Sequence, residues 1–163
     1  MKSMTHLLAL VICLSAMPDD ALADTGDMAI GTSVSVGSAG IFGEGAVAFA
    51  PRLDLRVGLL DWLHLDGSAG LAIVDGGSMV FANAELGLTA VLDVFTWVPE
   101  FKLSALVWAR KQLTIAPLAG LQVRYHFDAR WSWAFGGAVG PQFGGDVIAW
   151  VGAGSLSVLY SLD

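Results

Sequence analysis

Basic residues are scarce in this sequence. Its 163 residues include eight Lys and Arg against 15 Asp and Glu, which gives a net charge of −7. The few basic residues are scattered, and no run is dense enough to form the positive stripe that binds nucleic acid. Nucleic acid is therefore excluded as the expected partner.

Charge of either sign is also low. Charged residues make up 14% of the chain and hydrophobic residues 55%, whereas about 25% of the residues in a typical soluble protein are charged. A disordered chain would be poor in apolar residues and rich in charge, so this composition excludes disorder. The length predicts one domain.

Cysteine occurs once, as Cys13, inside an N-terminal segment that is typical of a secretory signal. A positively charged start and the apolar residues 7–16 lead to an A-x-A cleavage site at 21–23. We expect 1–23 to be a cleavable signal peptide and 24–163 to be the mature domain. The mature chain then has no cysteine, which excludes disulfides, a thiolate nucleophile and a cysteine-ligated metal.

An uninterrupted apolar run of about 20 residues, as a membrane-spanning helix needs, is also lacking. The longest nearly uncharged stretch runs from Trp131 to Leu162, and Pro141, Asp146 and seven glycines interrupt it. Apolar and polar residues continue to alternate through these glycines. Transmembrane helices are therefore the weaker interpretation of the apolar composition.

Strand patterning is what the sequence does contain. Apolar side chains recur at every second position, which is the period of a β-strand. Longer loops and short turns alternate between the segments, and consecutive segments of this length predict an up-and-down barrel. The expected all-β fold is an eight-stranded antiparallel transmembrane β-barrel with strands at 28–38, 43–60, 62–74, 78–92, 98–110, 112–127, 130–141 and 145–160.

The segment LDLRVGLLDWLHLDGSAGLAI, residues 53–73, shows the pattern most clearly. Its odd positions are mainly leucine, and its even positions include charged residues. If Leu59 and Leu63 share one face, the turn must hold an odd number of residues, such as Leu60-Asp61-Trp62, which fixes the register of the hairpin. The pairs that this register predicts are Arg56–Asp66, Gly58–His64 and Asp54–Ser68.

The apolar stripes of the strands are not interrupted by charge, and small residues with a few charges make up the opposite stripes. An eight-stranded barrel has just enough interior for side chains to fill it. Lipid outside a closed barrel explains both faces, because hydrocarbon tolerates neither charge nor an open strand edge. The charged residues expected in the interior are Glu44, Arg52, Asp54, Arg56, His64, Asp66, Glu85, Glu100, Lys102, Arg124 and His126.

Two prolines test this strand assignment. Pro51 and Pro117 both fall on positions that should face lipid, and each lacks one donor for the hydrogen-bond ladder. A β-bulge at each proline would reconcile these residues with regular strands.

Aromatic residues concentrate near the predicted short turns and the C-terminus. Amphipathic rings prefer the headgroup level of a bilayer, so we expect an aromatic girdle at this rim of the barrel. The predicted interfacial aromatics are Trp62, Trp97, Trp131, Trp133 and Tyr160.

Together, the signal segment, the eight alternating strands and hairpins such as LRVGLLDWLHLDGSAGL and GLQVRYHFDARWSWAFGGAVG resemble the small OmpA/OmpX-type outer-membrane β-barrels of Gram-negative bacteria. The resemblance covers essentially the mature chain. It implies a location in the outer membrane, insertion by the outer-membrane assembly machinery, and contact with outer-membrane lipid and lipopolysaccharide. We expect a monomer with a structural or envelope-interaction role.

Two other functions remain open. A lipid-modifying outer-membrane enzyme, an acyl hydrolase or transferase, would need a Ser–His–acid arrangement, for which His64 with Ser68 and Asp66, or His126 with Ser132, supply the residue types. A narrow small-solute channel is the other. We favour a charged network that plugs the barrel, because buried charges are normally paired. The sequence predicts no catalytic residue, cofactor or metal site, since two mature histidines without close spacing make no zinc site and no phosphate-binding loop is present.

Overall fold

The computed structural model describes residues 26–39, 47–74, 77, 79–92, 97–109, 113–144 and 147–162. The predicted signal peptide, 1–23, and the candidate interior residue Glu44 lie outside the described residues.

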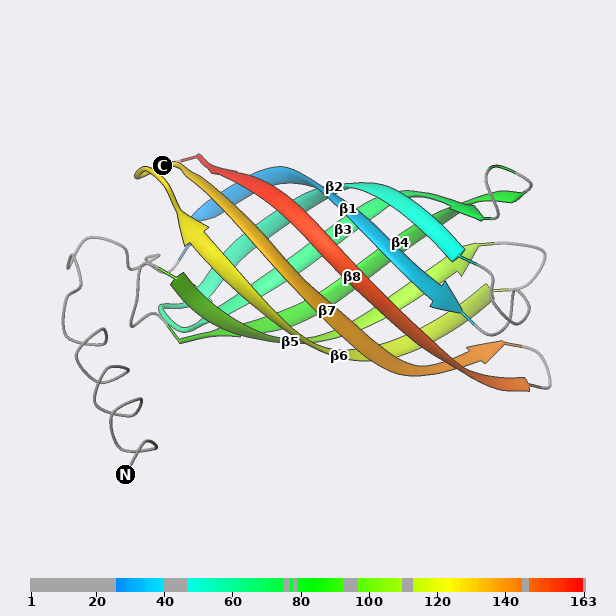
Figure 1. Cartoon of the computed structure of the whole chain (residues 1–163). Helices are drawn as coiled ribbons and strands as arrows, with labels where there is room; N and C mark the ends of the chain where they lie inside the picture. Colours follow the sequence, from blue (N-terminus) through cyan, green and yellow to red (C-terminus); the bar gives the residue numbers. More distant parts are fainter. Residues whose placement is uncertain are drawn as a thin grey trace, which may run out of the picture.

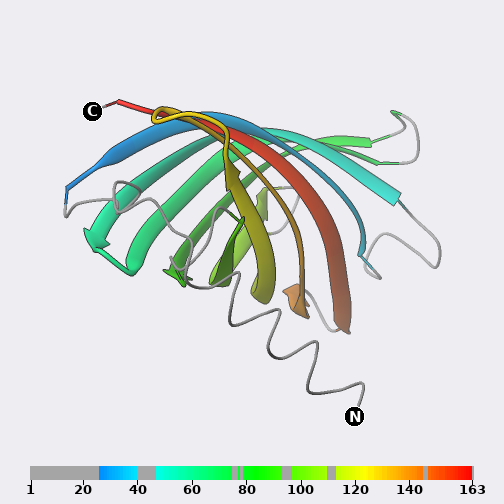
Figure 2. The ribbon, with the colours of Figure 1, turned by 60° about the vertical axis from the view of Figure 1, so that its left-hand side comes forward.

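The described residues form eight antiparallel strands that follow one another around a closed barrel (Figures 1 and 2). Each strand pairs with its neighbours in sequence, and β1 pairs with β8 to close the ring. Strands β2, β4, β6 and β8 end at one end of the barrel, the short-turn end, where the two-residue β2–β3 turn lies, and β1, β3, β5 and β7 end at the other (Figure 1). The strands are β1 (Met28–Ala39), β2 (Val47–Leu60), β3 (Leu63–Val74), β4 (Met79–Val91), β5 (Trp97–Ala109), β6 (Leu113–His126), β7 (Trp131–Gly144) and β8 (Val147–Ser161).

The predicted fold class is confirmed, and the strand ends differ by a few residues. β2 begins at Val47, and the predicted residues 43–46 lie outside the described residues. Among the ends that the structure describes, the largest difference is in β7, which continues to Gly144, whereas the sequence prediction ended it at Pro141. Pro141 pairs with Trp150 on β8, so this proline lies inside the strand instead of ending it.

The β2–β3 hairpin has the predicted pairs Arg56–Asp66, Gly58–His64 and Asp54–Ser68. Its turn is different from the prediction. Leu60 pairs with Leu63 across a two-residue turn, and the register shifts between Gly58 and Leu60. The extra residue that the prediction placed in the turn therefore forms an irregularity in β2, between Gly58 and Leu60.

The bulges predicted at Pro51 and Pro117 are wrong. Both prolines face outward as expected, but the register is unchanged across each of them. Pairing between β2 and β3 passes from Phe49–Ile73 to Arg52–Gly70, and pairing between β6 and β7 passes from Ile115–Phe143 to Ala119–Val139. The ladder positions around each proline are left unpaired, so the missing proline N–H requires no extra residue in the strand.

A glycine lies beside each of these prolines on the neighbouring strand. A Cβ atom on Gly70 would lie 2.0 Å from the carbonyl oxygen of Pro51, and one on Gly140 would lie 1.9 Å from that of Pro117. These distances are far shorter than any real contact of a Cβ atom. The strands therefore approach this closely only because glycine occupies both positions.

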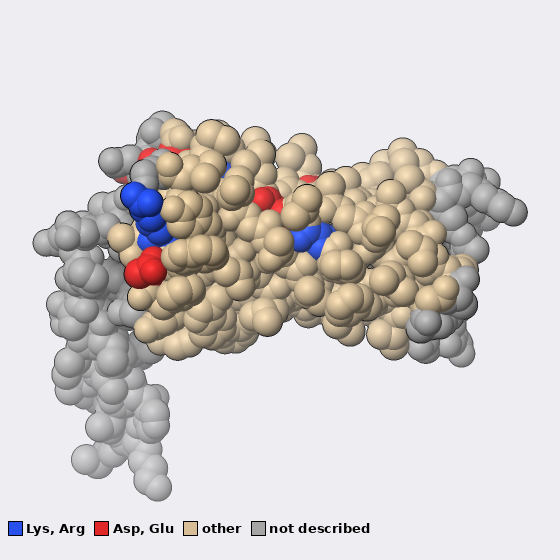
Figure 3. All heavy atoms as spheres, turned by 90° about the horizontal axis from the view of Figure 1, so that it is seen from above, with Lys and Arg blue, Asp and Glu red and all other residues tan. Residues whose placement is uncertain are grey.

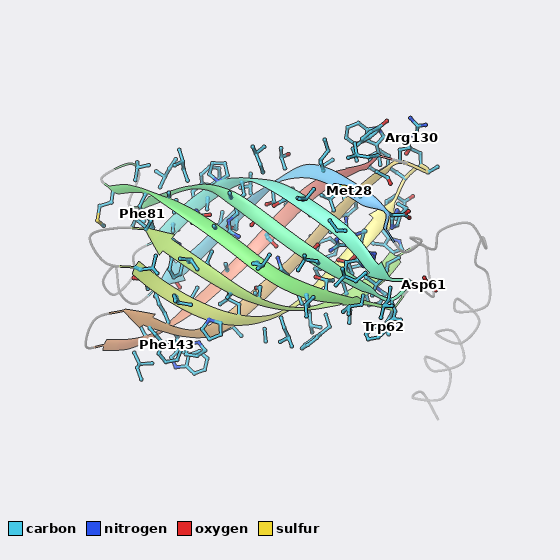
Figure 4. All side chains as sticks on the ribbon, turned by 180° about the vertical axis from the view of Figure 1, so that it is seen from behind. Met28, Asp61, Trp62, Phe81, Arg130 and Phe143 are labelled. Carbon is cyan, nitrogen blue, oxygen red and sulfur yellow. The ribbon has the colours of Figure 1, made fainter. Side chains whose placement is uncertain are left out.

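Inward-facing side chains fill the barrel in two layers. The polar layer occupies the half near the short turns. An apolar cluster fills the other half and includes Val74, Phe81, Leu106, Trp108, Leu118 and Val151. Phe81 lies at the opposite end of the barrel from Asp61 and Trp62 (Figure 4).

Gly140→Ala is expected to lower the free energy of unfolding by about 1–3 kcal/mol, because the added methyl group overpacks the backbone of Pro117. Urea unfolding of the refolded barrel, followed by tryptophan fluorescence, measures the change. Gly152→Ala is the matched control, since a Cβ there meets nothing within 4 Å. Equal losses in the two variants would contradict the close-approach explanation.

Candidate functional site

The outer wall of the barrel is free of charge. In the described ranges, no outward-facing strand position carries a charged side chain, and Thr32 and Ser38 on β1 are the polar exceptions away from the rim. Leu53 and Ile148 are each 70% exposed. Figure 3 shows one face of this wall, uncharged apart from a few spheres near its middle and a charged group at one end. Soluble monomers rarely expose a continuous apolar surface of this extent.

Aromatic rings collect at the short-turn end of this wall. Trp97 contacts Tyr125 and Trp133, with ring centroids 4.7 and 5.3 Å apart. Edge-on and tilted contacts between rings add a favourable free energy to that from burying their apolar surface. All five predicted interfacial aromatics belong to this rim: Trp62, Trp97 and Trp131 are exposed, and Trp133 and Tyr160 are half-buried.

A second group of outward aromatics lies toward the other end of the barrel. None of its members was among the predicted interfacial aromatics. Phe49, Phe143 and Trp150 are exposed there, and Figure 4 shows Phe143 at the end opposite Trp62. Trp133 and Phe143 lie on the same strand, β7. Their spacing in a tilted strand corresponds to an apolar band roughly 25 Å tall, the height found in transmembrane barrels.

Glu100 is the centre of the charged cluster inside the barrel. Its side chain is 1% exposed and forms ion pairs with Arg56 and Arg124, each with a closest N–O distance of 2.7 Å. Gln122 donates a further hydrogen bond to the same carboxylate. Three neighbouring or facing strands, β2, β5 and β6, are therefore joined through one carboxylate.

Asp66 is the second anionic partner of Arg56. Both of its oxygens accept hydrogen bonds from the guanidinium, at 2.7 and 3.2 Å, and Thr89 donates another. A bidentate pair of this kind fixes the orientation of the arginine as well as neutralising its charge. Arg124 in turn donates a hydrogen bond of 2.9 Å to the hydroxyl of Ser132.

A second cluster lies further toward the apolar layer. Arg52 and Lys102 share the carboxylate of Glu85, at 2.5 and 2.9 Å, and Ser104 donates a hydrogen bond to it. Asp54 lies beside this cluster and accepts a hydrogen bond of 2.9 Å from Ser33.

The charges of the described lumen balance. Arg52, Arg56, Lys102 and Arg124 oppose Asp54, Asp66, Glu85 and Glu100, so four positive side chains meet four negative ones. Burying an unpaired ion costs several kcal/mol, and this cost is largely avoided when ions of both signs are buried together.

The two histidines lie near this network, whose charges act on both of them, but neither forms an ion pair with it in the described part of the chain. His64 is 5% exposed in the lumen, whereas His126 lies at the exposed end of β6. His126 was predicted to be interior. It occupies an inward-facing position, but the strand ends there, and its side chain reaches solvent.

Neither Ser–His–acid combination forms a relay. Asp66 uses its oxygens on Arg56 and Thr89, and the hydroxyl of Ser132 accepts from Arg124. His64 Nδ1 and Ser68 Oγ are buried with no partner in the described part of the chain. A nucleophile needs a base within hydrogen-bond reach, and these pairings do not supply one.

The apolar layer is the part of the lumen that the sequence analysis missed. Charged and small residues are therefore not all that fills the interior, since four large apolar residues also point inward: Phe81, Leu106, Trp108 and Leu118. These residues occupy the same alternate positions as the predicted charges on β4, β5 and β6. The sequence could have shown them, because on each strand they have the same odd or even numbering as the residues predicted to face inward.

Across residues 26–39, 47–74, 77, 79–92, 97–109, 113–144 and 147–162, no group of three His, Cys, Asp or Glu side chains is placed to hold a metal ion. No helix in these ranges is long and apolar enough to cross a membrane.

The geometry defines a closed eight-stranded barrel with an apolar exterior and a filled interior, the architecture of transmembrane β-barrels. Solved structures share this fold. The N-terminal β-barrel domain of Pseudomonas aeruginosa OprF matches 83% of this chain and 99% of its own, with a TM-score of 0.53 and 12% identity. Neisserial surface protein A (NspA) matches 84% of this chain and 97% of its own, with a TM-score of 0.55 and 14% identity. These identities establish a common fold alone.

No protein-family model matches the chain, and no curated sequence matches it.

Glu100→Gln is expected to lower the free energy of unfolding by about 3–5 kcal/mol, because it leaves two buried arginines without their shared carboxylate. Urea unfolding of the refolded protein in micelles measures the loss. Asp61→Asn removes a carboxylate from an exposed turn and serves as the control. A loss below about 1 kcal/mol, the value typical of surface ion pairs, would show that Glu100 does not hold the cluster together.

Proposed function

We propose that this chain is an integral outer-membrane β-barrel protein of a Gram-negative bacterium, with a plugged interior and a structural or envelope-interaction role. The observation that carries the proposal is the outer wall, whose described strand positions have no charged side chain although the lumen holds eight. In water this arrangement would be inverted, because charge belongs on the solvated face. Lipid as the outer solvent removes the contradiction.

The aromatic rings at the two ends of the wall support the same proposal. They stand at the levels where the headgroups of a bilayer would meet the barrel, and tryptophan and tyrosine favour that depth. The fold shared with the OprF barrel domain and NspA agrees with a barrel that crosses the outer membrane. Lipopolysaccharide and outer-membrane lipid are then the surrounding partners, and the outer-membrane assembly machinery is the partner during insertion.

A plug fits the lumen better than an open channel. The Glu100 cluster and the apolar layer each fill the cross-section with side chains, and eight strands leave no wide aqueous path. A catalytic role has less support, since the histidines lack a relay. The role that we propose is therefore a structural or envelope-interaction role, without catalysis.

The membrane proposal is tested by gel mobility. The refolded protein is expected to run faster without heating than after boiling, because a closed barrel resists detergent denaturation. Solubility as a monomer without detergent, together with unchanged mobility on heating, would overturn the proposal.

Leu53→Arg is expected to destabilise the barrel in lipid vesicles by about 2–4 kcal/mol, the cost of an arginine near the bilayer midplane. Leu53 lies in the middle of β2 and is 70% exposed. Leu92→Arg is the depth control, because Leu92 is 64% exposed just after the end of β4 and should cost about 0–1 kcal/mol. Urea unfolding in vesicles compares the two. If both substitutions were neutral, the wall would face water.

A further inference from the structure

A cavity of about 90 Å³ lies in the lumen between the Glu100 cluster and the apolar layer. Since a single water needs roughly 10–15 Å³ of such space, the cavity has room for several waters or for a small molecule of about six non-hydrogen atoms. Four serines of β1 and β8 line one side, in the register pairs Ser33–Ser157 and Ser35–Ser155. Arg52, Asp54 and Ser68 from β2 and β3 also line the cavity.

Three polar atoms of these lining residues have no partner among the described residues. They are Asp54 Oδ2, Ser68 Oγ and Arg52 Nε, and all three are buried. Asp54 and Ser68 lie opposite each other in the β2–β3 ladder, and Arg52 lies two residues away on the same face of β2. Asp54 also differs from the other described luminal carboxylates, because Asp66, Glu85 and Glu100 each form ion pairs.

The charges around the cavity decide which ligand fits. The lining carries four positive side chains, Arg52, Arg56, Lys102 and Arg124, and three negative ones, Asp54, Asp66 and Glu85. Glu100, which is ion-paired with Arg56 and Arg124, lies directly behind them and brings the surroundings of the cavity to neutrality. A bound cation or anion alone would leave a net charge inside the barrel, which is costly. A molecule with a positive and a negative end adds no net charge and can serve the free acceptor and the free donor at once.

We infer that this cavity binds a small zwitterion of the α-amino-acid type. The ammonium group contacts Asp54 Oδ2 and Ser68 Oγ, and the carboxylate accepts a hydrogen bond from Arg52 Nε. The serine hydroxyls of β1 and β8 complete the site, since each can donate or accept. Glycine, with five non-hydrogen atoms, matches the available volume.

Binding is tested with the full chain refolded in micelles, with isotope-labelled glycine as the ligand and saturation-transfer NMR as the measurement. Glycine is present during refolding in one series and added afterwards in the other, so that slow entry is separated from absence of binding. Ethylammonium supplies the positive end alone and acetate the negative end alone. Glycine is expected to bind at least about tenfold more tightly than either, as one charge-assisted hydrogen bond is worth this factor or more.

Asp54→Asn is expected to weaken glycine binding about tenfold or more, and Ser68→Ala provides a second variant should Asp54→Asn fail to refold. Arg130→Gln, which changes a charge on an exposed turn, is the matched control and is expected to bind as the unaltered chain does. Heat-dependent gel mobility verifies the fold of each variant, so loss of binding is separable from failure of the membrane proposal.

Three results would overturn the inference. The first is no glycine signal in either refolding series, which would mean that water alone occupies the cavity. The second is ethylammonium or acetate binding as tightly as glycine, which would mean a simple ion site. The third is glycine binding that Asp54→Asn and Ser68→Ala leave unchanged.

Discussion

Pairing of β1 with β8 is the contact on which the rest of the structure depends. It runs from Ala29–Ser161 to Ala39–Val151 and closes the sheet, so that no strand has a free edge. Closure also fixes the volume of the interior, because eight strands define a narrow lumen. Most of the described inward side chains are accordingly small, apolar or ion-paired, and the buried amides of Asn83 and Gln142, which have no hydrogen-bond partner among the described residues, are exceptions. Ion pairs hold the polar layer together, and packed rings and aliphatic groups fill the apolar layer.

Within the polar layer, Glu100 links residues that are distant along the chain. Arg56 is 44 residues from Glu100, and Arg124 is 24 residues away on the other side. Both guanidinium groups bind the same carboxylate, and without its negative charge they would repel each other. The cluster therefore depends on the complete barrel, because its members come from three strands that meet only when the ring has formed. The apolar wall and the charged lumen are the two faces of one closed sheet, and alternation along each strand supplies both.

Much of the fold could be predicted from the sequence, because side chains in a strand alternate with a period of two. The hairpin pair Arg56–Asp66 followed from parity and one turn. Pairs such as Arg56–Glu100 and Arg52–Glu85 did not, since they depend on how far the strands are staggered around the whole ring. The effect of proline was also misjudged, because an unpaired ladder position and a bulge look alike in a sequence. The apolar layer was missed because Phe81 and Trp108 resemble outward-facing residues until their parity is counted.

The two proline–glycine contacts have a geometric consequence. One interrupts pairing between β2 and β3, and the other interrupts it between β6 and β7. In a ring of eight strands, these two interfaces stand diametrically opposite each other. They divide the wall into two shells of four strands, each continuous within itself and joined to the other along two seams with fewer hydrogen bonds. The two prolines therefore place the gaps in the hydrogen-bond ladder on opposite sides of the ring, and neither shell of four strands contains both.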